Sequence, residues 1–212
     1  MTRINKGKPY PLGSSITSTG VNFSLIATNA EYVEILLFEE EYSISPQYIF
    51  KLDQKNNTGP YWHAEIKNIR EGCIYAFRIK QKNNGINNNY EKKVLIDPCS
   101  RGITGWVNYK RENALKTQEN TATCLKSVVC ERKKFNFKDY PRPKHPWKET
   151  IIYELHIKAF TESTEGDESC CKKFLKKIPY LKELGITTIE LLPMFCFDPT
   201  DAPNGLENFW GY

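Results

Sequence analysis

The stretch GVNFSLIATNAEYVEILLFEE, residues 20–40, decides the fold of the first part of the chain. Each of its halves places an apolar residue at every second position. Successive side chains of a β-strand point to opposite faces, so this pattern predicts two strands, each with one buried face. The residues expected to point inward are Val21, Phe23, Leu25 and Ala27 in the first half, and Val33, Ile35 and Leu37 in the second.

The same pattern continues to about residue 98. The segments QYIFKLD, YWHAEIKNI, CIYAFRIKQ and YEKKVLIDP follow, separated by turn-rich pieces such as QKNNTGP and REG. The polar stretch NNGINNN, residues 83–89, is typical of a long hairpin tip. Several short strands at this spacing predict an all-β sandwich of the immunoglobulin-like type, which we assign to residues 1–110.

Periodicity fades between about residues 99 and 149. The segment PRPKHPW, residues 141–147, contains three prolines. Proline fixes φ and removes a backbone donor, so this segment is expected to be extended. We therefore predict a linker over residues 111–149.

A different pattern begins at residue 150. TIIYELHI, residues 150–157, is a nearly continuous apolar run of the kind found in strands of parallel sheets. Phe174, Ile178, Leu181 and Leu184 then recur at helical spacing. Pro179 is expected to kink that helix or to open a second one, and Gly185 is the expected stop. ITTIELL, residues 186–192, is the next buried strand, which completes a β-α-β unit.

This unit suggests an α/β barrel that is incomplete. A (β/α)₈ barrel has eight such units in about 250 residues, whereas residues 150–212 hold one. The expected fold is therefore multidomain: a sandwich followed by the truncated start of a barrel.

Composition excludes several classes of function. The net charge of +5 comes from 30 basic and 25 acidic residues spread along the chain, without the clustered basic face typical of nucleic-acid binding. No apolar run approaches the roughly 18 residues of a membrane span, and the N-terminus lacks the apolar core of a signal peptide. The seven cysteines are scattered, with no Cys-x-x-Cys pair, so we expect reduced thiols in the cytoplasm and neither a metal nor a cofactor.

Four motifs together resemble isoamylase-type glycogen debranching enzymes of the α-amylase superfamily (glycoside hydrolase family 13). GKPYPLGSSITSTGVNFSLIATNAEYVEILLFEE resembles their N-terminal opening, and ETIIYELHIKAFT resembles their first barrel strand. IPYLKELGITTIELLPMFCFD resembles the first helix and second strand, and NFWGY resembles the Asn-Tyr-Trp-Gly-Tyr loop that follows. The motifs occur in the family's order and cover nearly the whole chain.

The resemblance implies a carbohydrate-binding-type sandwich followed by the start of the catalytic barrel. Complete relatives hydrolyse α-1,6 branch points of glycogen or starch with two carboxylates in a retaining mechanism. In the family those acids lie on strands four and five, so no catalytic residue is expected in this chain, which we expect to be inactive alone. The implied partners are an α-glucan and the remainder of the barrel.

The resemblance also implies candidate substrate-binding residues. The family's counterpart of Tyr212 stacks on the glucose unit at the cleavage point, and an aromatic plate suits the apolar face of a sugar. Trp210 is a second candidate, although packing beneath the loop is the more common role of such a residue. Trp106 is a third, in the less regular part of the sandwich. Trp62 alternates with Ala64 and Ile66, which favours a place in the core.

Four polar residues of the second part have structural interpretations. Glu154 and Glu190 lie inside strands, whereas barrel active sites form at the carboxyl ends of strands. His156 is expected to be a hydrogen-bonded core residue, and Asp198 a turn residue.

Two alternatives stay open. The sandwich could act as a stand-alone α-glucan-binding module, or the chain could derive from a branching enzyme or a trehalose-forming relative. The chain also departs from the family between residues 161 and 178, where ESTEGDESCCKKFLKK replaces the usual Gly-Thr-Tyr-type stretch. This change puts the fine specificity in doubt.

Overall fold

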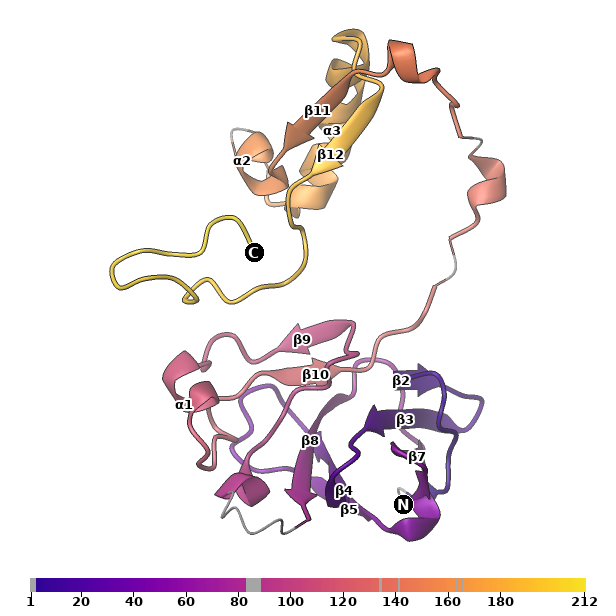
Figure 1. Ribbon diagram of the computed structural model, residues 1–212, viewed down its shortest axis with the longest axis vertical. Helices are drawn as coiled ribbons and strands as arrows, with labels where there is room; N and C mark the ends of the chain where they lie inside the picture. Colours follow the sequence, from indigo (N-terminus) through magenta and orange to yellow (C-terminus); the bar gives the residue numbers. More distant parts are fainter. Residues whose placement is uncertain (1–2, 83–88, 134, 141, 163, 165) are drawn as a thin grey trace. The chain divides into compact units, whose positions relative to one another are not determined.

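The computed structural model describes residues 3–82, 89–133, 135–140, 142–162, 164 and 166–212. The chain forms two compact units, Met1–Lys134 and Phe135–Tyr212 (Figure 1). The hairpin tip predicted around residues 83–88 lies outside the described residues. Among the described helices, none has both the length and the apolar composition that a membrane crossing requires.

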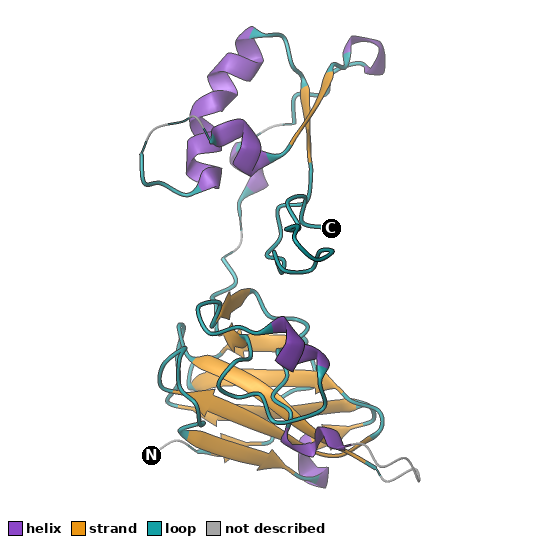
Figure 2. Ribbon diagram, turned by 90° about the vertical axis from the view of Figure 1, so that its left-hand side faces the viewer, coloured by secondary structure: helices purple, strands orange, loops and turns teal. Residues whose placement is uncertain are grey.

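The first unit is a sandwich of two antiparallel sheets (Figure 2). The first sheet has the order β1 (Ile4–Asn5), β7 (Tyr61–Lys67), β3 (Gly20–Ile26) and β2 (Gly13–Ile16), with β6 (Asn57–Thr58) also paired to β7. The second has the order β5 (Tyr48–Leu52), β4 (Ala30–Phe38), β8 (Ile74–Gln81), β10 (Lys126–Val128) and β9 (Gly102–Thr104).

The core between the sheets contains the residues that the alternation predicts. Phe23 and Ile35 are 1% and 0% exposed, and Val21, Val33 and Leu37 share their cluster. The rings of Phe23 and Tyr75 meet edge to face at a centroid distance of 4.8 Å, which joins the two sheets.

Part of the outer face of the second sheet is also buried. Leu36 and Ala76 are both 0% exposed and pack with Phe38, Val94 and Cys124, so β4 is covered on both faces. Val94 and Cys124 provide this cover, and the short helix α1 (Arg111–Leu115) lies between them in sequence.

The outer face of the first sheet is covered near the N-terminus by residues 6–12, here called the N-terminal strap. The Lys8 N–H donates to Asn22 Oδ1 (2.7 Å), and Ser24 Oγ donates to the Pro9 carbonyl (2.6 Å). His63 Nδ1 lies 2.8 Å from the Lys6 carbonyl oxygen. Asn22 and Ser24, which alternation places on a wet face, are therefore 5% and 1% exposed.

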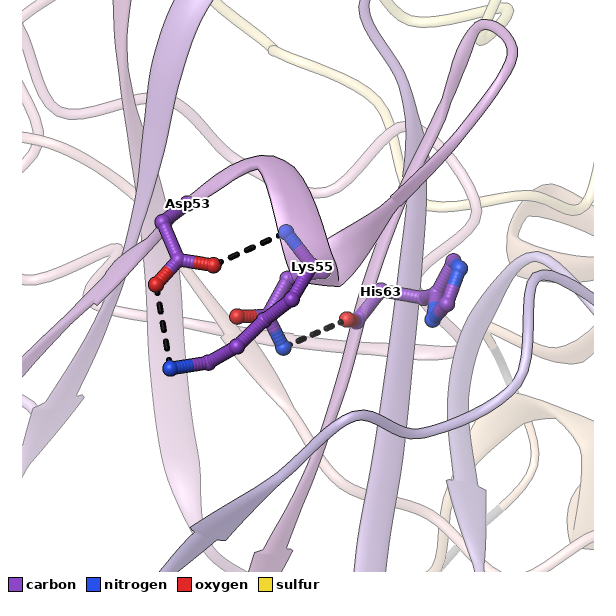
Figure 3. A network of polar contacts seen from close by, with 4 residues as sticks. Asp53, Lys55 and His63 are labelled. Atoms are coloured by element: carbon purple, nitrogen blue, oxygen red, sulfur yellow. Dashed lines mark hydrogen bonds and ion pairs between the residues drawn. The ribbon is translucent and has the colours of Figure 1, made fainter.

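A capped turn connects β5 to β6 and β7 (Figure 3). Asp53 Oδ1 accepts from the Lys55 N–H (2.9 Å), and Asp53 Oδ2 lies 3.1 Å from Lys55 Nζ. The hydrogen bond from Lys55 lowers the pKa of the Asp53 carboxyl. Asn56 Nδ2 donates to the His63 carbonyl (3.2 Å), so the turn is tied to the middle of β7.

One predicted boundary and one predicted strand differ from the structure. The first unit extends to Lys134, not residue 110, because β10 pairs with both β8 and β9. The second unit begins at Phe135, so the segment predicted as the linker 111–149 is divided between the two units. YEKKVLIDP is not a strand: it begins with a 3-10 turn at Asn89–Lys92 and makes a single bridge, from Leu95 to Phe77.

The second unit contains a β-α-β arrangement. β11 (Ile152–Leu155) pairs in parallel with β12 (Thr188–Leu191), and α2 (Ile157–Thr161) and α3 (Cys170–Glu183) lie between them in sequence. α3 continues through Pro179, so the prediction of a second helix there is wrong. Gly185, at φ +87°, follows the helix as predicted. The short helix α2 was not expected.

The sheet of the second unit is covered on one face. Leu155 and Leu181 are 5% and 1% exposed and pack with Ile157, Tyr153 and Ile189. Ile152, on the other face of β11, is 49% exposed. The apolar run at residues 150–157 had suggested burial on both faces, so the structure corrects this expectation.

Candidate functional site

The candidate substrate-binding loop follows β12 and ends at Tyr212. Asn208 organises its last turn: its N–H donates to the Pro199 carbonyl (2.8 Å), and its Oδ1 accepts from the Gly211 N–H (3.0 Å). Its Nδ2 also donates to the Tyr212 carbonyl (3.0 Å). Gly211 has φ +80°, and a Cβ there would lie 2.9 Å from the Phe197 ring, so glycine fits where a larger residue would not.

Three aromatic rings meet where this loop passes the end of β11. His156 stacks on Phe209 at a centroid distance of 4.6 Å and meets the edge of Trp210 at 5.9 Å. His156 is 9% exposed, and its Nδ1 accepts from the Ala159 N–H (3.2 Å) at the start of α2. The expectation of a hydrogen-bonded core histidine is confirmed.

The two loop aromatics differ in their freedom to meet a ligand. Trp210 is 53% exposed and makes edge-to-face contacts with His156 and Phe209, whereas Tyr212 is 80% exposed. An exposed phenol ring offers a flat apolar face with a hydroxyl at its tip, which suits a sugar ring. The loop can thus offer a ligand the exposed ring of Tyr212 and the partly packed ring of Trp210.

An apolar hollow of about 240 Å³ lies near the loop. Its lining includes His156, Pro193, Met194 and Phe197, together with Cys171 of α3. All seven cysteines of the chain are free thiols. Within the described ranges no cluster of three or more His, Cys, Asp or Glu side chains could hold a metal ion.

The other polar candidates have structural surroundings. Glu154 and Glu190 are direct register partners on β11 and β12, both exposed, and they lie within the strands and not at the carboxyl ends. Asp198 Oδ1 accepts from the N–H and the hydroxyl of Thr200 (2.9 and 2.7 Å), as expected of a turn residue.

The tryptophans of the sandwich have different surroundings. Trp62 is 6% exposed and donates from Nε1 to the Ala27 carbonyl (3.1 Å), so it is a core residue, as favoured. Trp106 is half-buried and meets Tyr109 edge to face at 5.6 Å. Trp106 belongs to the first unit, whereas Trp210 and Tyr212 belong to the second.

Sequence reasoning missed a polar groove on the first unit. Its lining includes Tyr10, whose side chain is 76% exposed, together with Ser15, Arg101 and Arg132. A tyrosine between two prolines is the one local signal that could have drawn attention to it, because proline restricts the backbone on both sides.

Comparison with known proteins agrees with this architecture. Residues 11–100 match carbohydrate-binding module 48, described as the isoamylase N-terminal domain. The glycogen debranching enzyme of Erwinia tasmaniensis is 33% identical over an alignment that covers 100% of this chain and 34% of the enzyme. That of Pectobacterium atrosepticum is 31% identical with the same coverage. The chain thus spans about a third of the length of these relatives.

Solved structures show the same fold. The GBS pullulanase SAP, in complex with maltotetraose, has a TM-score of 0.66 at 19% identity, over 89% of this chain and 24% of that chain. The pullulanase from Paenibacillus barengoltzii has a TM-score of 0.63 at 17% identity, over 91% of this chain and 28% of that chain. Residues 11–100 thus resemble carbohydrate-binding module 48, and the whole chain is similar to the corresponding third of glycogen debranching enzymes.

Proposed function

We propose that this chain serves as the N-terminal part of an isoamylase-type glycogen debranching enzyme that hydrolyses α-1,6-glucosidic branch points in the cytoplasm. The sandwich would be its α-glucan-binding module, and the second unit the opening of its catalytic barrel. The reaction would be the retaining, two-carboxylate hydrolysis of this superfamily, with one carboxylate attacking the anomeric carbon while the other protonates the leaving oxygen.

The observation that carries this proposal is the extent of the similarity. Debranching enzymes match this chain over 100% of its length, in both units and at 31–33% identity. A relationship confined to residues 11–100 would support a binding module alone. The continuation through β11, α3, β12 and the final loop favours an enzyme.

The geometry of the second unit supports its assignment to a (β/α)₈ barrel. β11 and β12 are parallel neighbours, with helices between them in sequence and packed on one face. In such barrels helices cover the outside, and side chains of the inner face pack in layers at the centre. The exposed face that carries Ile152, Glu154 and Glu190 matches an inner face that further strands would cover.

We assign substrate contact to Tyr212 and Trp210 in the loop after β12, and to Trp106 in the sandwich. In barrel enzymes the loops after strands form the active site, and the NFWGY loop follows β12 directly. We assign no catalytic residue within this chain, because the nucleophile and the acid would lie on later strands of the barrel. These later strands are also the proposed partner of the exposed sheet face.

A chimera tests the proposal. The corresponding third of the Erwinia tasmaniensis glycogen debranching enzyme is replaced by this chain, and release of linear chains from a branched limit dextrin is measured. We expect the chimera to debranch, the chain alone to be inactive, and Tyr212→Ala in the chimera to lower kcat/KM at least about tenfold, since a stacking contact at the cleavage point is lost. A folded chimera without activity, or hydrolysis by the chain alone, would contradict the proposal.

A second candidate function is a stand-alone α-glucan-binding module. The observation in its favour is that the first unit has its own core between two sheets and contains the whole module match. Affinity electrophoresis in glycogen gels separates the two ideas when it is combined with the chimera assay. Retardation of the chain, reduced by Trp106→Ala, with an inactive chimera would favour the module alone.

A further inference from the structure

Two neighbouring hollows on the first unit lie beside strand β2, the edge strand of the first sheet. One has a volume of about 530 Å³ and is lined in part by Ser14, Ser15 and Ile16. The other, of about 690 Å³, is lined by the residues that follow β2, from Ile16 to Gly20. Ile16 and Glu131 line both hollows, so the two are neighbours, and they are here together called the β2 groove.

Tyr10 offers an aromatic surface in this groove. Its side chain is 76% exposed, although the backbone that carries it is fixed. On one side the Lys8 N–H and carbonyl both bond the Asn22 side chain (2.7 and 3.0 Å), and the Pro9 carbonyl accepts from Ser24. Pro9 and Pro11 restrict the chain on either side of the tyrosine. A backbone that is fixed before binding reduces the conformational entropy lost when a ligand stacks on the tyrosine.

The polar side chains of the groove suit a neutral polyhydroxyl ligand. Arg101 and Arg132 line the hollow that contains Tyr10, and Glu131 lies at the junction of the two hollows. Planar guanidinium and carboxylate groups can bond pairs of neighbouring hydroxyls, while an aromatic ring covers the apolar face of a sugar. Glu71 lines the second hollow beside Lys67 and Arg70, so the lining of the groove contains charges of both signs, four basic and two acidic.

We propose that the β2 groove binds an α-glucan chain, with one glucose ring stacked on Tyr10 and neighbouring hydroxyls bonded by Arg101, Arg132 and Glu131. Its length, through two hollows, fits several sugar units in a row. The ligand class rests on the proposed function, but the location is new. Trp106, Trp210 and Tyr212 do not line the groove. The groove would hold glycogen on the first unit.

Isothermal titration calorimetry of the 212-residue chain with maltoheptaose tests the groove. Tyr10→Ala is expected to raise Kd at least about tenfold, since a single exposed aromatic platform is lost. Arg132→Gln, which keeps length but removes charge, is expected to raise it about threefold to tenfold. Tyr42→Ala is the matched control: Tyr42 is 62% exposed on the same unit and lies outside the groove lining, so Kd should stay within about twofold.

Amide chemical shifts locate the ligand independently. With maltoheptaose, we expect changes at residues 13–20 and 67–71, and thermal unfolding of each variant should match that of the unsubstituted chain. Shifts that gather at Trp106 or at residues 208–212, with Tyr10→Ala without effect, would overturn the groove but leave glucan binding intact. If the folded chain does not bind maltoheptaose at all, the proposal that the groove binds glucan is also wrong. The chimera assay would then test the proposed function separately. Stronger binding of heparin fragments than of maltoheptaose would also overturn it.

Discussion

Strand β4 of the first unit and strands β11 and β12 of the second are covered in different ways. In β4, Ile35 and Leu36 are neighbours in sequence and point to opposite faces, yet both are 0% exposed. In β11, Leu155 is 5% exposed on the helix side, whereas Ile152 is 49% exposed on the other. Strand β4 of the first unit is thus covered on both faces, whereas the sheet of the second unit has one exposed face.

This difference has a consequence for stability. A sheet with two buried faces gains apolar burial on both, at about 25 cal/mol per Å². Two strands with one covered face gain about half as much per strand and keep open edges. We therefore expect the units to unfold separately, the second first.

Core substitutions give the largest effects and test this separation. Phe23→Ala should lower the free energy of unfolding of the first unit by about 3–5 kcal/mol, because it opens a cavity between the sheets. Leu181→Ala should lower that of the second unit by about 2–5 kcal/mol and leave the first unchanged, since the two cores share no residue. Denaturant titration followed by amide NMR resolves both transitions. A shift of the first transition in Leu181→Ala would break the comparison.

Glycine substitutions test the cover that the strap gives to the first sheet. Gly7 has φ +71°, and a Cβ there would lie 2.6 Å from the Ala64 carbonyl carbon and from Asn22 Oδ1. Gly7→Ala should therefore cost about 1–3 kcal/mol through strain and displacement of the strap. Gly59→Ala is the matched control: φ is +61° but nothing lies within 4 Å, so about 1 kcal/mol is expected. Equal losses by thermal denaturation would mean that close packing of the strap contributes nothing.

Paired substitutions on β11 and β12 sharpen the difference between their faces. Ile189 packs on the helix side, so Ile189→Ala should destabilise the second unit by about 1–2 kcal/mol. Ile152 on the open face is 49% exposed, and Ile152→Ala should stay within about 0.5 kcal/mol. The readout is the second transition in denaturant. Comparable losses would show that the open face is packed in solution.

The smallest expected effect concerns acid sensitivity of the first unit. Hydrogen bonds from the Thr17 and Thr19 hydroxyls (2.6 and 2.7 Å) lower the pKa of Glu65 below its usual value of 4.5. A lowered folded-state pKa adds stability above pH 4.5 that is lost as pH falls through the folded value. Glu65→Gln should thus make the melting temperature of the first unit depend less on pH over this acidic range. An unchanged slope would mean that the hydroxyls do not favour the carboxylate.

Local patterns predict the sandwich strands well and its boundary poorly. Alternation places Phe23, Val33 and Ile35 correctly, because successive side chains of a strand point to opposite faces and the pattern can be read from neighbouring residues. The three-residue strands β9 and β10 are too short to show a period, and their partners lie far away along the chain. Burial of Asn22 and Ser24 depends on the strap, which a strand pattern does not contain.

Some features of the candidate site can likewise be predicted from local sequence, and others cannot. The positions of Asp198 in a turn, His156 in a buried hydrogen-bonded place and Trp62 in the core follow from local sequence. The β2 groove cannot be predicted from local sequence, because Tyr10, Arg101 and Arg132 come from three distant segments that only the fold brings together.

Native-state hydrogen exchange of the whole chain measures the central difference most directly. Amides of β3, β4, β7 and β8 should exchange only through global unfolding of the first unit, and those of β11 and β12 at least about a hundredfold faster through opening of the second unit. Equal protection of β4 and β12 would contradict the account, because it would mean that the second unit covers its sheet as completely as the first.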